Sequence, residues 1–308
     1  MLSFITAVAG LASILGFFGR FWWVFDLVSH FRLQYFGLLL INAVLFLLGR
    51  RPRPATVAGL VAAVNFLPLL PFLARTPREQ TGDQSWRALF INVNRYNRAY
   101  ARIHTLIGRL KPDFVILAET DAGWLPEFEK LQADYPYWHG RLGSQSSSGV
   151  YLFSRIPLQN VQALDFGLTP RPLIVAQMEL DGRPFTLIGA HPHSPTGPLR
   201  TARRNRQMAE LAQYALAQPG EVMVMGDLNI SPWSPFFQQF IRTSGLRDGR
   251  RGFGLKLTWP TIFPFLRIPI DHCLTSAGVT IHRFDTGPFI GFDHFPIVVH
   301  FSTAPPKQ

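Results

Sequence analysis

The charged residues of this 308-residue chain are distributed so unevenly that they constrain its fold more than any other feature. Residues 1–19, 33–48 and 54–74 contain no charged side chain, and no comparable stretch follows them. A helix needs roughly 20 apolar residues to cross the ~30 Å core of a bilayer. The sequence therefore predicts a membrane anchor over residues 1–74 with about three transmembrane helices, near 2–19, 33–48 and 54–74, then a linker over 75–86 and a second domain over 87–303.

A signal peptide followed by buried core helices is the alternative explanation for these stretches. The first stretch lacks the basic start of a signal peptide, however, and two further apolar runs follow it. Cytoplasmic loops retain arginine and lysine, so the loop with Arg50, Arg51 and Arg53 is predicted to face the cytoplasm. The chain would then be a multi-pass protein of the inner (cytoplasmic) membrane, with its second domain on the periplasmic or extracellular side. Two arginines just after the third stretch favour the opposite orientation.

Net charge and cysteine content narrow the classes of protein further. A net charge of +11 suits polyanionic partners such as nucleic acid, phospholipid headgroups or phosphorylated substrates. The excess is almost entirely arginine, which can also reflect genome composition. Cys273 is the single cysteine, which excludes an intramolecular disulfide and zinc sites built from several cysteines. We expect it to be a small buried side chain in a strand.

The pattern of apolar residues after position 86 predicts a mixed α/β sandwich. Strands are expected over residues 88–93, 114–118, 150–153, 173–180, 185–190, 222–225, 270–274, 279–284 and 296–301. Helices are expected over residues 100–110, 200–217 and 235–243. The turn Asp181-Gly182-Arg183 joins two of the strands as a hairpin.

Five of these apolar segments run directly into carboxylate, amide or imidazole side chains. The polar residues at their ends are Asn92, Asn94, Glu119, His191, Asp227, Asn229, Asp271 and His272. The pair Asp293-His294 follows a short loop that contains a glycine. Strand ends that converge on one edge of a sheet would gather these groups in one pocket.

Such a set of side chains suits the hydrolysis of a phosphate ester. Oxygen ligands such as Glu119 and the amide of Asn92 suit Mg²⁺ or Mn²⁺ rather than a thiolate-seeking metal. A hard cation polarises the phosphoryl oxygen and offsets the charge that builds in the transition state. Asp227 and Asn229 are two residues apart on a turn, where they can orient a water and a phosphoryl oxygen from one side. An imidazole then supplies a proton or a hydrogen bond.

The order and spacing of these motifs over residues 86–301 resemble the endonuclease/exonuclease/phosphatase superfamily, which includes deoxyribonuclease I. The segment Gly226-Asp227-Leu228-Asn229 is weak on its own, whereas five segments in the family's order are specific. The resemblance implies an α/β fold of the deoxyribonuclease I type, a four-layer α-β-β-α sandwich. It also implies a hydrolase of phosphoric ester bonds that depends on Mg²⁺ or Mn²⁺.

The same resemblance implies which residues act. The metal ligands would be Asn92, Glu119 and Asp293. The catalytic residues would be His191, Asp227, Asn229, Asp271, Asp293 and His294. Asp227 would activate or orient the water, and Asn229 would contact the phosphate. Asp271 would belong to a carboxylate–imidazole network in which His294 is a general base or a phosphate contact. His191 would contact the scissile phosphate or assist the leaving group.

Other polar residues have a plain structural explanation beside a functional one. His193 is expected to contact substrate or lie at the surface rather than bind metal, and His272 is expected to face the rim of the site. Arg203 and Arg204 either meet a substrate phosphate or are solvated. Glu127 and Glu129 are expected to be solvated charges on a helix.

The substrate class is the weakest inference from the sequence. Anchoring gives an active site a high effective concentration towards lipids in the same bilayer. The layout also resembles VanJ-type membrane proteins linked to glycopeptide-antibiotic resistance, which implies a polyprenyl (pyro)phosphate or another envelope lipid as substrate. A membrane-tethered nuclease and a non-catalytic membrane scaffold remain alternatives, although the intact site residues argue against the scaffold. Oligomeric state is left open.

Residues 250–267 give a second indication of lipid contact. Aromatic and aliphatic side chains alternate there with Arg250, Arg251, Lys256 and Arg267. An apolar loop surrounded by cations is suited to a layer of lipid headgroups. The alternative is that the segment around Trp259 packs on the core of the domain and makes no contact with lipid.

Overall fold

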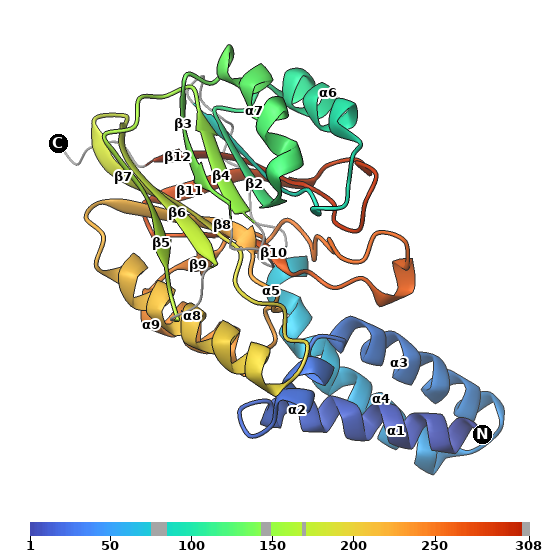
Figure 1. Ribbon diagram of the computed structural model, residues 1–308. Coiled ribbons are helices and arrows are strands. Elements are labelled where there is room, and N and C mark those ends of the chain that lie inside the picture. Colours follow the sequence, from blue (N-terminus) through green and yellow to red (C-terminus); the bar gives the residue numbers. More distant parts are fainter. Residues whose placement is uncertain (75–84, 143–148, 168–170, 304–308) are drawn as a thin grey trace.

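Most of the predicted linker falls outside the residues that the structure describes. The computed structural model describes residues 1–74, 85–142, 149–167 and 171–303. After residue 84 the chain forms two six-stranded sheets that pack face to face, with helices on both outer surfaces (Figure 1). The prediction of a four-layer α/β sandwich is confirmed.

The first sheet has the strand order β11-β12-β1-β2-β4-β3. Its strands are β1 (Trp86–Asn92), β2 (Phe114–Thr120), β3 (Tyr137–Arg141), β4 (Gly149–Ser154), β11 (Val279–Thr286) and β12 (Ile297–Thr303). β1 and β2 run parallel, and their register places Asn92 beside Ala118. Asn92 and Glu119 therefore lie next to each other at the carboxyl end of this pair.

The second sheet has the order β5-β6-β7-β8-β10-β9. Its strands are β5 (Asn160–Asp165), β6 (Pro172–Leu180), β7 (Arg183–Ala190), β8 (Glu221–Asp227), β9 (Arg247–Asp248) and β10 (Asp271–Thr275). β6 and β7 form the predicted hairpin. β7 and β8 are parallel with Ala190 beside Gly226, so that His191 and Asp227 follow at neighbouring strand ends.

Alternating side chains of the strands build three apolar layers. One face of each sheet meets the other sheet, as for Phe90 of β1 and Leu187 of β7. The outer face of the first sheet packs on α6 (Tyr100–Leu110), η3 (Ala122–Trp124) and α7 (Leu125–Gln132). The outer face of the second sheet packs on α8 (Pro198–Leu216) and α9 (Pro235–Ser244). Cys273 is fully buried between the sheets, as expected.

Three edge strands, β3, β5 and the two-residue β9, were not anticipated from the sequence. β3 and β5 carry mostly exposed or half-buried side chains, because an edge strand covers the core with one face only. Their polar composition hides the alternation that marks a strand. His272 also differs from expectation: it is fully buried beside Arg250, whereas the side chain of its neighbour Asp271 faces His294. Successive residues of a strand point to opposite faces, so His272 cannot line the rim that Asp271 approaches.

The first 74 residues are helical, but they do not form three helices that each satisfy the length of a membrane span. The elements are α1 (Leu2–Leu15), η1 (Gly16–Phe18), α2 (Trp23–Ser29), α3 (Arg32–Leu48), α4 (Pro52–Phe66), η2 (Leu67–Leu69) and α5 (Leu70–Leu73). Only the continuous 22-residue helix over Pro52–Leu73 is long and apolar enough to cross a membrane. A second candidate exists only if Leu2–Phe18 and Trp23–Ser29 form one span, although they are bent by 115°.

The prediction of three spans is thus corrected to one or two candidates. α3 has 17 residues, and at about 1.5 Å per residue it falls short of the ~30 Å hydrocarbon core. The first apolar helix ends at Phe18, and the chain bends by 115° before α2 begins at Trp23.

Candidate active site

The site is built where two parallel strand pairs, one from each sheet, end at the same edge of the sandwich. β1 ends in Asn92, and Glu119 is the residue before the last of β2. His191 directly follows β7, and β8 ends in Asp227. Strands that run parallel bring their carboxyl ends to one edge, which is the usual position of ligand sites in α/β folds. Asn92 and Asp227, 135 positions apart, therefore come within hydrogen-bonding distance.

Local backbone geometry turns these side chains into the site. Glu119 has a positive φ of 60°, and the pairing of β2 with β4 is irregular between Ala118 and Thr120. A bulge of this kind re-aims the side chain that it carries. Asn94 and Asn229 also have positive φ, a conformation that asparagine tolerates better than most residues. Positive φ in non-glycine residues often accompanies functional sites.

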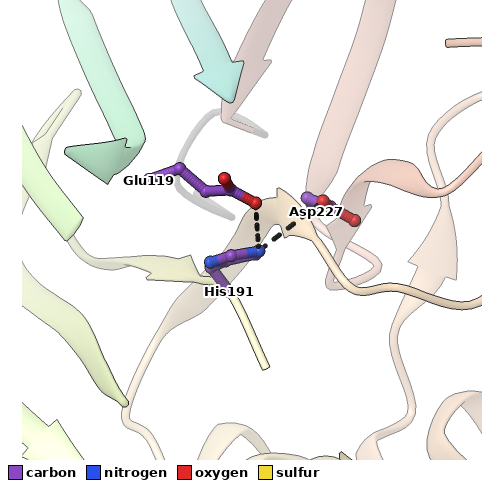
Figure 2. Close-up of side chains that lie close together, drawn as sticks. All are labelled: Glu119, His191 and Asp227. Carbon is purple, nitrogen blue, oxygen red and sulfur yellow. Dashed lines mark ion pairs between the residues drawn. The ribbon is translucent and has the colours of Figure 1, made fainter. Parts of the chain in front are cut away.

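Glu119, His191 and Asp227 form the first group of converging side chains (Figure 2). His191 Nε2 lies 3.3 Å from Glu119 Oε1 and 3.7 Å from Asp227 Oδ2. One ligand atom from each residue lies within 4.8 Å of the other two. Three atoms at such separations can coordinate a common cation.

Asp227, Asp271 and His294 form a second group that shares Asp227 with the first. The antiparallel pairing of β8 and β10 places Asp271 directly beside Asp227. His294 Nδ1 lies 2.9 Å from Asp271 Oδ2, and its Nε2 lies 3.6 Å from Asp227 Oδ2. Asp271 thus fixes the orientation of the imidazole, whose other nitrogen faces the centre of the site.

Asn92, at the end of β1, links the two groups, because it contacts Glu119 in its own sheet and Asp227 in the other sheet. Its Nδ2 donates to Glu119 Oε1 at 3.1 Å and to Asp227 Oδ2 at 3.0 Å. Burial alone would raise the pKa of Glu119, but hydrogen bonds and charge from His191, together with Asn92, lower it to about 2. Glu119 is therefore ionised throughout the neutral range.

Asp227 and His294 have shifted acidities that differ in cause. Burial raises the pKa of Asp227 to about 6, helped by nearby Asp271 and opposed by the two imidazoles. Burial would lower the pKa of His294, but the charges of Asp271 and Asp227 outweigh it and raise this pKa to about 10. Asp227 can thus accept a proton near neutral pH while His294 carries one.

The chemistry of the donor set fits a hard divalent cation. Glu119 and Asp227 supply carboxylate oxygens, and the side-chain amide of Asn92 lies beside both of them. Carboxylates crowded around a buried point, as Asp227 and Asp271 are, are stabilised by a cation. The predicted ligands Asn92 and Glu119 lie at this centre.

Two other predicted residues lie slightly apart from it. Asp293 belongs to neither group: its Oδ1 accepts from Asn94 Nδ2 at 3.0 Å and its Oδ2 accepts from Trp259 Nε1 at 3.1 Å. Asn229 donates from its backbone N–H to Asp227 Oδ1, and its side chain donates to the carbonyl of Pro192. The carboxylate of Asp293 therefore contacts Asn94 and Trp259 rather than the two groups, whereas the backbone of Asn229 holds the carboxylate of Asp227 in place.

Arg171 is a site residue that the sequence analysis missed. Its Nη1 lies 3.4 Å from His191 Nδ1. The charges of Glu119 and Asp227 are near enough to oppose the effect of burial, which lowers the pKa of this arginine. The register of β6 with β7 pairs Ile174 with Gly189, so extending the hairpin by three residues places Arg171 opposite Pro192. The register of the predicted hairpin could therefore have indicated that Arg171 lies near the site.

Carboxylates, an amide and imidazoles at one edge of an α-β-β-α sandwich define the class of metal-dependent phosphoesterases. Residues 89–302 match the sequence profile described as the Endonuclease/Exonuclease/phosphatase family. The chain belongs to this family. It is accordingly a hydrolase of phosphoric ester bonds, as the motif order implied. No curated protein sequence matches the chain significantly.

Solved structures of this fold superpose on the chain. Human Nocturnin, whose catalytic domain was solved with a bound sulfate anion, has a TM-score of 0.60 at 20% identity, over 71% of this chain and 94% of that one. Humanized TDP2 from D. rerio has a TM-score of 0.59 at 17% sequence identity, and the match covers 71% of this chain and 99% of that one. An endonuclease/exonuclease/phosphatase from Beutenbergia cavernae has a TM-score of 0.59 at 18% sequence identity, and the match covers 72% of each chain. At such identities the likeness establishes the fold alone.

Proposed function

We propose that the chain is a membrane-anchored phosphoesterase that uses Mg²⁺ or Mn²⁺ to hydrolyse a phosphate ester or pyrophosphate of a lipid in its own bilayer, such as a polyprenyl (pyro)phosphate of the envelope. The observation that carries the hydrolytic part is the convergence of Glu119, His191 and Asp227 within 4.8 Å. By the charge of its loops, the site would face the periplasm or the extracellular side of the inner membrane.

Burial in the N-terminal helices supports anchoring. Polar side chains lie inside the bundle of α1, α3 and α4, where Asn65 donates to Ser13 Oγ at 2.9 Å and Asn42 donates to Thr6 Oγ1 at 2.9 Å. Large apolar side chains point outward, and Leu48 and Leu60 are mostly exposed. A bundle with polar contacts inside and apolar residues outside suits a lipid environment.

The position of the anchor relative to the site supports a lipid substrate. Asp26 forms an ion pair with Arg204 of α8, and His30 Nδ1 lies 2.9 Å from Ser231 Oγ in the loop that follows Asp227 and Asn229. These contacts fix the helices to the catalytic domain, so that helices lying in a membrane would hold the domain against its surface. A tethered site meets membrane-borne substrates at high effective concentration.

Cations beside the site suit a substrate with negative charge beyond the scissile phosphate. Burial, together with the charges of Arg171, Arg203 and Arg200, lowers the pKa of His193 to about 4. His193 is therefore neutral and marks a cluster of arginines. The same cluster would suit the phosphates of nucleic acid, so a membrane-tethered nuclease is the second candidate.

A bound Mg²⁺ or Mn²⁺ would polarise the phosphoryl oxygen and stabilise the charge of the transition state. Asn92, Glu119 and Asp227 would hold it. Asp227, kept in place by the N–H of Asn229, would orient the attacking water and accept its proton. His294 would donate a hydrogen bond to the phosphate from Nε2, and Asp271 would keep that nitrogen directed at the substrate. Arg171 would bind a further phosphoryl oxygen.

Replacement of Asp271 by asparagine is expected to lower kcat by about 10²-fold. The charge of Asp271 helps to raise the pKa of His294, so its loss would lower that pKa. If His294 acts in its protonated form, the alkaline limb of the pH–rate profile of Asp271→Asn should move to lower pH. Rates measured from pH 6 to pH 10.5 would show the shift, and an unchanged alkaline limb would count against the protonated role of His294.

Two assays on the detergent-purified chain test the proposed function. We expect Mg²⁺-dependent release of phosphate from a polyprenyl pyrophosphate, and little nicking of plasmid DNA under the same conditions. Chelation of the divalent cation should abolish the release, and its return should restore it. Nicking without turnover of the lipid would favour the nuclease, and failure of both would leave the substrate proposal without support.

A further inference from the structure

An exposed apolar loop lies next to the active site. Residues 261–267 contain Ile262, Phe263, Phe265 and Leu266, all of them exposed, and Phe265 retains 90% of its accessible surface. Water around so many large apolar side chains is unfavourable by roughly 25 cal/mol for each Å². Contiguous exposed apolar surface of this kind marks a site of contact with a protein or a membrane.

The loop is held in a defined shape, so its apolar tip is not the result of a loose chain. A bridge between Trp259 and Ile268 closes its base. Arg267 reaches across the loop: its Nη2 donates to the carbonyl of Thr261 at 2.5 Å, and its guanidinium lies 4.8 Å from the ring centroid of Phe295. The tip itself is the short helix η4 (Pro264–Leu266).

The loop extends towards the same side of the molecule as the N-terminal helices. Gln34, in the first turn of α3, donates from Nε2 to the carbonyl of Arg267 at 2.8 Å. Figure 1 shows the orange loop projecting from the sandwich in the direction in which α3 and α4 leave it. If these helices lie in a bilayer, the tip of the loop reaches the surface of that bilayer.

We propose that residues 261–267 insert their apolar tip into the bilayer surface beside the active site. The inference rests on the proposed anchoring and adds a second point of contact to it. The occupant of this surface is a lipid layer, because Gln34 joins the loop to α3, which exposes the apolar side chains of Leu38, Ile41 and Leu45. Aromatic residues near a cation such as Arg267 suit the headgroup boundary.

Insertion would bring the catalytic centre to its substrate. The base of the loop holds Asp293 on two sides, since Trp259 Nε1 donates to its carboxylate and the N–H of Thr261 donates to its carbonyl at 2.9 Å. Two hydrogen bonds therefore join the loop to the closing Asp293-His294 pair. A tip fixed in the lipid would keep the entrance of the site at the level of the phosphates.

A fluorescent label at Phe265 tests the insertion directly. Cys273 is fully buried, so a cysteine at position 265 can be labelled selectively with the environment-sensitive dye NBD. Phe265→Cys, labelled and reconstituted in vesicles of phosphatidylethanolamine and phosphatidylglycerol, is expected to show a blue-shifted emission that spin-labelled lipids quench. Leu216→Cys, an exposed leucine at the far end of α8, is the matched control and should keep the emission of an aqueous dye.

The outcomes separate the loop from the anchor. Quenching at position 265 and none at position 216, in protein that floats with the vesicles, supports the insertion. Protein that floats with the vesicles but shows aqueous emission at position 265 overturns it. Protein that does not float at all overturns the proposed anchoring, and the insertion with it.

Discussion

Replacement of Glu119 by glutamine is expected to reduce phosphate-ester hydrolysis by about 10³-fold without unfolding the chain. Cation coordination contributes several kcal/mol to stabilisation of the transition state, and ~1.4 kcal/mol corresponds to a factor of ten in rate. Glutamine keeps the size of the side chain but removes the negative charge that attracts the cation. The initial rate at saturating Mg²⁺ measures the loss, and calorimetric titration should show weakened binding of the cation.

Glu129→Gln is the matched control for this prediction. Glu129 is an exposed carboxylate on α7, only ten residues further along the chain, and its removal leaves the site untouched. Its variant should keep the rate and the cation affinity of the original chain. A Glu119→Gln variant that retains more than about a tenth of the rate would remove Glu119 from the list of essential metal ligands.

Most of the polar residues of the site could be located from the sequence because they lie at or directly after the end of an apolar strand. The end of a strand is a short-range feature, which can be recognised without knowledge of the rest of the fold. Examples are the runs Phe90-Ile91-Asn92 and Met225-Gly226-Asp227. Parallel pairing of β1 with β2 and of β7 with β8 then brings those ends to one edge. The motif order supplied the family, which the profile match over residues 89–302 established.

Ion pairs between residues far apart in the sequence could not be predicted in this way. Arg204 was expected to be solvated or to meet a phosphate, but it is fully buried and pairs with Asp26 of α2, 178 residues away. The sequence around Arg204 and around Asp26 gives no indication that the two residues pair. The length of the helices was also misjudged, because the absence of charge marks an apolar run but does not show where a helix bends.

The N-terminal helices and the active site are joined through this buried pair. Arg204 Nη1 donates to the carbonyl of Asn229 at 3.1 Å, and Ser234 Oγ donates to Asp26 Oδ1 at 2.5 Å. Asn229 in turn donates to Asp227. A short chain of hydrogen bonds thus leads from α2 to the carboxylate proposed to orient the water.

Substitution of Asp26 by asparagine is therefore expected to destabilise the folded chain by about 3–5 kcal/mol, because it leaves the buried guanidinium of Arg204 without its counter-charge. Denaturant unfolding in detergent, followed by circular dichroism, would measure the change. Asp165→Asn is the matched control, since Asp165 pairs with Arg141 at the surface with both side chains well exposed. Exposed pairs contribute under about 1 kcal/mol. Equal stability losses in the two variants would show that the Asp26–Arg204 pair does not hold the anchor to the catalytic domain.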